Sequence, residues 1–145
     1  MIGLLQRVSE GRVRIEGELV TEIATGILVL VGVQREDNEA KAERLLERLL
    51  GYRIFPDESG RMNLSLRDID GGLLLVPQFT LAADTRKGTR AGFSRAAAPD
   101  EGERLFTHLV SLARETHSPV GCGVFGADMQ VELVNDGPVT FWLET

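Results

Sequence analysis

The sequence predicts an α+β domain, a curled mixed β-sheet forming a roll or partial barrel with two main helices packed outside it. Its 145 residues suit a single domain, spanning 1–145, that is long enough to bury a core. Strand-like segments precede, separate and follow two helical segments. Two helices cannot cover both faces of roughly eight strands, which favours a sheet that curls on itself and leaves an apolar face for a homodimer.

The first segments are strand-like. "LLQRV" (4–8) and "RVRIE" (12–16) alternate apolar and polar residues, and "EGE" (16–18) predicts a turn before "LVTEI" (19–23). "GILVLVGV" (26–33) is an unbroken apolar run rich in β-branched residues. Such a run indicates a central strand that is buried on both faces.

Two segments have helical patterns. The first starts at Asp37 or Asn38 as N-cap, carries leucines at helical spacing, and has Gly51 at the position after its end. The second starts at Pro99 and stops at Ser118-Pro119. Each has one apolar stripe, so each is expected to lie on the sheet.

The other segments predict further strands. "YRIF" is a short strand, and "GGLLLVPQFTL" (71–81) is a second buried strand with Pro77 inside it, where proline removes a ladder donor. "GCGVFG", "MQVEL" and "VTFWL" close the chain. Asn135-Asp136-Gly137 between the last two predicts a hairpin turn. Pro138 is less usual there, because X-Pro bonds in folded proteins are sometimes cis for a reason.

The composition narrows the class of protein. Apolar residues make up 43% of the chain and charged residues 26%, as in ordinary globular proteins. The apolar runs are too short to span a bilayer and no secretory signal begins the chain, so we expect a cytoplasmic protein without a membrane partner. Cys122 is the single cysteine and the two histidines share one helical stretch, so we expect no metal site.

Known catalytic motifs are missing from the sequence. It has no P-loop, no Gly-x-Ser-x-Gly elbow and no nucleophile beside a histidine. The net charge of −6 argues against coating nucleic acid by bulk electrostatics. "TRKGTRAGFSR" (85–95) nevertheless holds four basic residues and no acid. A solvated loop is the ordinary interpretation of this stretch, and a local nucleic-acid patch is the alternative.

Several motifs together resemble the D-aminoacyl-tRNA deacylase family over essentially the whole chain. They are "LLQRV", "YRIFPDESGRMNLSL", "PQFTLAADTRKGTRAGFS" and "GVFGADMQVELVNDGPVT". The resemblance implies a compact homodimeric α+β roll that needs no metal or organic cofactor. It implies hydrolysis of the ester that joins a D-amino acid, or mischarged glycine, to the terminal adenosine of tRNA.

The resemblance also implies a catalytic stretch at Gln78, Phe79 and Thr80. Backbone N–H groups of Phe79 and Thr80 would stabilise the developing oxyanion, and the terminal ribose 2′-hydroxyl would assist the attack. We favour a positioning role for Thr80 over a nucleophilic one, because no base is visible to activate its hydroxyl.

The closing motif would supply chiral selection. A cis Gly137-Pro138 bond would reach into the partner subunit's site and leave no room for an L side chain, with Arg7 bracing it. Phe125 and Met129 would line the adenosine or aminoacyl pocket, with ordinary core positions as the alternative. The tRNA phosphates would be held by Arg86, Lys87 and Arg90.

One position departs from the family pattern. Pro77 stands where the family usually has serine, so a hydroxyl and a backbone N–H are lost beside the catalytic stretch. This departure keeps open a second hypothesis, a non-catalytic module that binds the acceptor end of tRNA.

Overall fold

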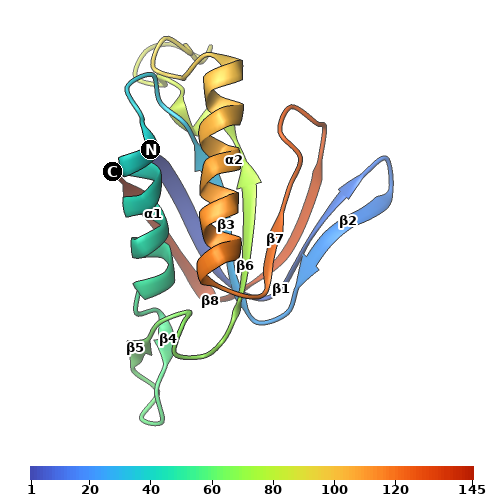
Figure 1. The fold of residues 1–145 in the computed structure, drawn as a ribbon, viewed down its shortest axis with the longest axis vertical. Coiled ribbons are helices and arrows are strands. Elements are labelled where there is room, and N and C mark those ends of the chain that lie inside the picture. The colour runs from blue at the N-terminus through green and yellow to red at the C-terminus, as the bar shows by residue number, and fades with distance from the viewer.

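The computed structural model describes residues 1–145, and its two long helices lie on one face of a curled sheet (Figure 1). The elements in chain order are β1 (Ile2–Ile15), β2 (Glu18–Ile23), β3 (Gly26–Gly32), α1 (Glu39–Gly51), β4 (Phe55–Pro56), β5 (Met62–Leu64), β6 (Gly72–Pro77), the 3-10 turn η1 (Phe79–Ala82), α2 (Pro99–Thr116), β7 (Val120–Cys122) and β8 (Gln130–Glu144). The predicted α+β class is confirmed.

The main sheet is mixed and nearly closed. Its strand order is β2-β1-β3-β6-β7, and β8 pairs with β1. β3 and β7 both run parallel to β6, whereas β2, β3 and β8 run antiparallel to β1. β7 comes back against β2 so closely that a Cβ added to Gly121 would lie 2.4 Å from the hydroxyl oxygen of Thr21. The predicted partial barrel is therefore confirmed.

The hairpin turn predicted at residues 135–137 is wrong. β8 runs through this segment as one strand, and both of its halves pair with β1. Gln6 pairs with Thr140 and Val8 with Asn135, so β8 uses five residue steps where β1 uses two. The excess forms a bulge, which carries the same Asn-Asp-Gly signal as a hairpin because both need turn residues. We call residues 136–139 the β8 bulge.

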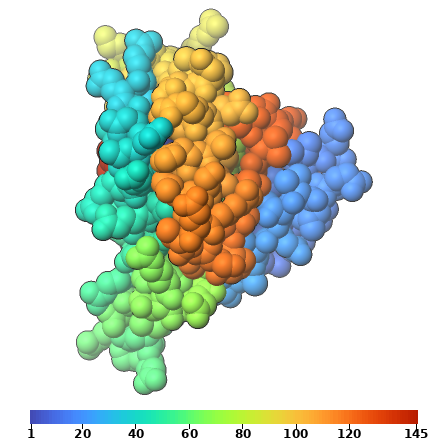
Figure 2. All heavy atoms as spheres, viewed as in Figure 1, coloured from blue at the N-terminus to red at the C-terminus, as the bar shows by residue number.

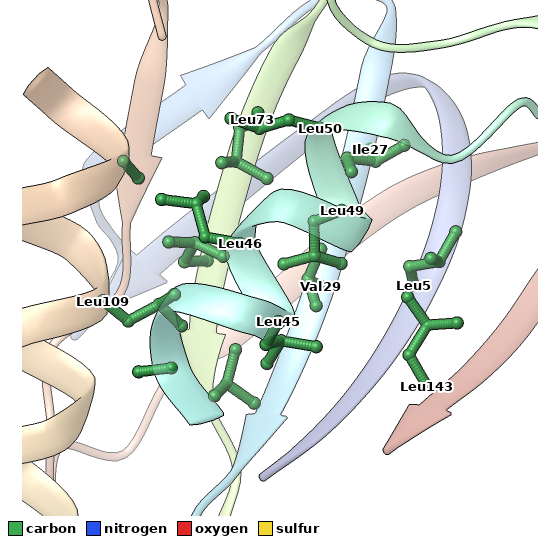
Figure 3. Packing of buried hydrophobic residues seen from close by; sticks show 14 of the residues in the cluster. Leu5, Ile27, Val29, Leu45, Leu46, Leu49, Leu50, Leu73, Leu109 and Leu143 are labelled. Atoms are coloured by element: carbon green, nitrogen blue, oxygen red, sulfur yellow. The ribbon is translucent and has the colours of Figure 1, made fainter. Parts of the chain in front are cut away.

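β3 and β6 are buried on both faces, as their apolar runs predict. In β3, Ile27 and Val29 belong to the cluster beneath the helices, whereas Leu28 belongs to a second cluster inside the barrel. Leucines of α1 point toward β3 and β6 and meet Leu109 of α2 (Figure 3). α1 and α2 lie side by side and cover this face (Figure 2).

The helix ends refine the predictions from sequence. Asn38 is the N-cap of α1, since its side chain accepts a hydrogen bond from the Lys41 N–H at 3.0 Å. Asp37 is instead a buried carboxylate that pairs with the amino group of Met1 at 2.6 Å. Gly51 is the last residue of α1 rather than the residue after it. Neither helix has the length and apolar character needed to cross a membrane.

Candidate active site

A cavity of about 470 Å³ opens where β3 and β6 end. The start of α2 and the segment between β7 and β8 complete its wall, which is mostly apolar. Four of the predicted site residues line it: Gln78, Phe79, Phe125 and Met129. Its volume and apolar lining are typical of sites for small ligands.

Pro77 ends β6 rather than interrupting it. The Gln78 N–H donates to the Val31 carbonyl at 2.8 Å, so pairing with β3 continues past the proline. On the other edge, the last bond to the β7 side runs from the Gly123 N–H to the Leu75 carbonyl at 2.8 Å. Proline lacks the N–H that would extend this ladder, and the chain leaves the sheet at the cavity wall.

The 3-10 turn η1 follows at once and presents Phe79 and Thr80 at the surface. Its bonds run from the Leu81 N–H to the Gln78 carbonyl at 3.3 Å and from the Ala83 N–H to the Thr80 carbonyl at 3.2 Å. The first N–H groups of such a turn have no acceptor within it, and here they belong to Phe79 and Thr80. The Thr80 hydroxyl accepts a hydrogen bond from the Gln78 side-chain amide, which orients the hydroxyl.

The start of α2 contributes a contact that the sequence analysis missed. Gly102 lies in the first turns of α2, and a Cβ there would lie 3.2 Å from the ring of Phe125. The glycine thus lets the Phe125 ring approach the helix beside the cavity. A glycine within a helical pattern is disfavoured by about 1 kcal/mol relative to alanine. Its presence there was the one feature of the sequence that could have indicated a close contact.

The β8 bulge is held by Arg7. The Nε of Arg7 donates to the Asp136 carbonyl at 2.9 Å, and Nη1 donates to the Ile54 carbonyl at 2.7 Å. The Gly137-Pro138 peptide bond is cis, and Gly137 has φ of 141°. Both residues are exposed to solvent. At Gly137 and Pro138 the bulge is therefore an anchored, exposed stretch of backbone that carries little side chain.

The β8 bulge and the cavity lie at opposite ends of the sheet. Arg7 pairs with Ile27 at the start of β3, whereas Val31 and Val33 line the cavity at its other end. At about 3.3 Å per residue, these positions are separated by about 13 to 20 Å. The structure therefore does not bring Gly137, Pro138 or Arg7 to the cavity of the same chain.

The three predicted phosphate-binding residues differ in their contacts. Arg86 donates three hydrogen bonds to the Asp84 carboxylate, from Nε at 2.9 Å, Nη2 at 2.6 Å and the backbone N–H at 3.1 Å, and these hold the pKa of the Asp84 carboxyl well below its usual range. Lys87 and Arg90 are exposed and make no ion pair. Asp84 directly precedes the basic stretch 85–95 in the sequence. An interpretation of that stretch alone therefore did not include the acid that pairs with Arg86.

The family model for D-Tyr-tRNA(Tyr) deacylase matches residues 4–144. The chain belongs to this family. It is therefore an enzyme of the deacylase class, a hydrolase.

Relatives and solved structures are similar to this chain over nearly its full length. A protein of Alkalilimnicola ehrlichii named D-aminoacyl-tRNA deacylase is 67% identical over 99% of this chain and 96% of its own length. One of Thioalkalivibrio sulfidiphilus with the same name is 70% identical over 99% and 97%. The structure of a c-Myc DNA unwinding element binding protein is 36% identical, with a TM-score of 0.95 over 100% and 99% of the two chains. A probable eukaryotic D-amino acid tRNA deacylase shares the fold at 20% identity and a TM-score of 0.82, over 99% and 98%.

Proposed function

We propose that this chain hydrolyses the ester bond of D-aminoacyl-tRNA, including mischarged glycyl-tRNA, and releases the amino acid and free tRNA. Membership of the deacylase family over residues 4–144 is the observation that carries the proposal. The relatives' names indicate the substrate class, and the apolar cavity beside Gln78 and Phe79 offers a place for the terminal aminoacyl-adenosine.

Catalysis in this proposal depends on backbone donors. Water attacks the ester carbonyl, and the oxyanion accepts hydrogen bonds from the N–H groups of Phe79 and Thr80. The 2′-hydroxyl of the terminal ribose assists the attack, and Thr80 positions rather than attacks. The position of these N–H groups at the start of η1 supports the assignment, because the turn itself offers them no acceptor.

Chiral selection is assigned to Gly137-Pro138 of the partner subunit in a homodimer. The bulge projects from the surface, is anchored by Arg7, and lies far from the cavity of its own chain. Those three facts support action on a neighbouring copy. Backbone atoms placed against the α-carbon would exclude every L side chain whatever its identity, whereas glycine and D-residues would fit.

The direct test is hydrolysis of D-tyrosyl-tRNA and L-tyrosyl-tRNA by the purified protein. We expect release of D-tyrosine with L-tyrosyl-tRNA left intact. Equal rates on the two substrates, or no turnover of either, would contradict the proposal. Tight binding without turnover would instead favour the alternative, a non-catalytic module for the acceptor end of tRNA. Pro77 motivates that alternative, although the Gln78 bond to β3 persists beside it.

Thr80→Val removes the hydroxyl but keeps the shape and the backbone N–H. We expect kcat to fall by less than about tenfold, because the backbone N–H groups of Phe79 and Thr80 that we assign to the oxyanion stay in place. Single-turnover hydrolysis of D-tyrosyl-tRNA measures this effect, with thermal unfolding as the check on folding. A loss of about 10³-fold or more in a folded protein would restore Thr80 as nucleophile.

Lys87→Gln and Arg90→Gln should each weaken tRNA binding and lower the slope of log K against log salt by about 0.7 per phosphate contact. Arg86→Gln is the matched control, because its guanidinium is already paired with Asp84. We expect a smaller change for it in the same fluorescence titrations between 50 and 200 mM salt, the range over which such contacts are normally lost. An equal effect of all three substitutions would show that the Asp84 pair opens in the complex.

A further inference from the structure

Two exposed phenylalanines lie together beside the cavity, and one of them, Phe79, lines it. Phe79 is 61% exposed and Phe93 is 43% exposed. Their ring centroids are 5.1 Å apart, and the ring planes are inclined by 46°. By contrast, Phe55 and Phe106 are buried in the core. Exposed aromatic pairs of this kind commonly mark a binding surface.

Backbone contacts hold Phe93 in place. Asp84 and Gly92 exchange two hydrogen bonds, of 2.7 and 3.0 Å, which closes the loop just before Phe93. The Ala96 N–H donates to the Phe93 carbonyl at 3.1 Å, which closes a turn just after it. The segment between η1 and α2 stands at one end of the molecule, beside the start of α2 (Figures 1 and 2). The ring of Phe93 is therefore presented by a fixed loop.

We propose that Phe93, backed by Phe79, stacks on the unpaired base that directly precedes the terminal adenosine of the bound tRNA. The inference rests on the proposed function, in which the cavity takes the terminal aminoacyl-adenosine. The ring of Phe79 lines that cavity and also meets Phe93, so the aromatic surface begins at the cavity wall and extends outward from it. A nucleotide that precedes an adenosine bound in the cavity would lie within reach of this surface. Aromatic side chains bind unpaired bases by stacking, irrespective of base identity.

The charge around Phe93 favours RNA over an apolar peptide as the occupant. The segment 84–95 contains four basic residues and a single acid, in a chain whose net charge is −6. The acid is Asp84, which Arg86 already neutralises. Lys87, Arg90 and Arg95 remain for phosphates on either side of a stacked base. Cations interleaved with an exposed aromatic residue are typical of surfaces that follow a single strand.

The test compares Phe93→Ala and Phe93→Tyr on three substrates. These are D-tyrosyl-tRNA, the same tRNA with an abasic ribose before the terminal adenosine, and D-tyrosyl-adenosine, which has no preceding nucleotide. We expect Phe93→Ala to raise KM for D-tyrosyl-tRNA by about tenfold with kcat nearly unchanged, and Phe93→Tyr to stay close to wild type. Leu19→Ala is the matched control, because Leu19 is also an exposed apolar residue but lies on β2, away from Phe93. It should change neither KM nor kcat.

The abasic substrate separates stacking from a merely structural role. It should raise KM of the wild type by about the same tenfold factor and add nothing to Phe93→Ala. D-tyrosyl-adenosine should be hydrolysed equally by both proteins. The inference is overturned if the abasic site leaves the wild-type KM unchanged, or if Phe93→Ala impairs hydrolysis of D-tyrosyl-adenosine to the same extent.

The inference and the proposed function can fail separately. If the wild type does not turn over D-tyrosyl-tRNA at all, the proposed function fails, and the same comparison is made on the Kd of uncharged tRNA. A tenfold loss shared by Phe93→Ala and the abasic tRNA would then still support stacking. Equal Kd values across these combinations would overturn it.

Discussion

Gly137→Ala is expected to reduce kcat/KM for D-aminoacyl-tRNA by about 100-fold or more, since small displacements of positioning groups have effects of this size. At a φ of 141° a side chain is disfavoured, and the new Cβ would lie 2.7 Å from Cγ2 of Val139 and 3.0 Å from its backbone nitrogen. It would also lie 3.2 Å from Nη2 of Arg7. The bulge must therefore move, and with it the backbone that we assign to chiral selection.

Gly17→Ala is the control for this substitution. Gly17 also has a positive φ, of 83°, but a Cβ there meets nothing within 4 Å. It should therefore destabilise the protein by about 1 kcal/mol through backbone strain and leave kcat/KM unchanged. Initial rates on D- and L-tyrosyl-tRNA, with thermal unfolding of both variants, complete the comparison. Normal D-specific turnover by folded Gly137→Ala would exclude a role for this backbone in selection.

Arg7→Met is expected to release the bulge and to lower the free energy of unfolding by about 1 to 3 kcal/mol, chiefly because the part-buried Ile54 carbonyl loses its donor. The Arg7 side chain is only 13% exposed and bonds the carbonyls of both Asp136 and Ile54. Its ion pair with the exposed Asp136 carboxylate, at 3.6 Å, adds little. Methionine keeps the apolar length of the side chain and removes only its donors.

Arg14→Met is the matched control for Arg7→Met on the same strand. Arg14 also reaches across to β8, where it pairs with the exposed Glu132 at 3.0 Å. An exposed pair of this kind is worth less than about 1 kcal/mol. We expect only Arg7→Met to lower the ratio of D- to L-tyrosyl-tRNA hydrolysis, by about tenfold for the loss of a single ordering contact. Equal ratios for both variants would leave Arg7 a purely structural residue.

The spacing of apolar residues was enough to predict the architecture, because the burial of a strand or helix directly determines where its apolar residues fall. The apolar run 26–33 predicted a strand buried on both faces, and Ile27 and Leu28 do enter different clusters. The β8 bulge could not be told from a hairpin, since Asn-Asp-Gly serves both and only the pairing of each half with β1 decides between them. Local pattern carries no information about a partner strand more than a hundred residues away.

The candidate site was predictable only in part for a similar reason. Gln78 and Phe79 share a motif, and the resemblance to the family linked them with Phe125 and Met129, which line the same cavity. Motif matching did not reveal that Arg86 forms an ion pair with Asp84, because that pairing depends on side-chain geometry. It also did not indicate that the Phe93 ring packs against Phe79. The sequence of that loop draws attention to its basic residues rather than to its single phenylalanine.

The interior of the barrel is filled rather than hollow. Val76 lines the cavity and belongs to the cluster inside the barrel, on which Met129 also packs. The side of the cavity that faces the barrel is therefore formed by packed apolar side chains. In the proposed reaction, the attacking water would therefore have to enter from the solvent side of the cavity rather than through the barrel.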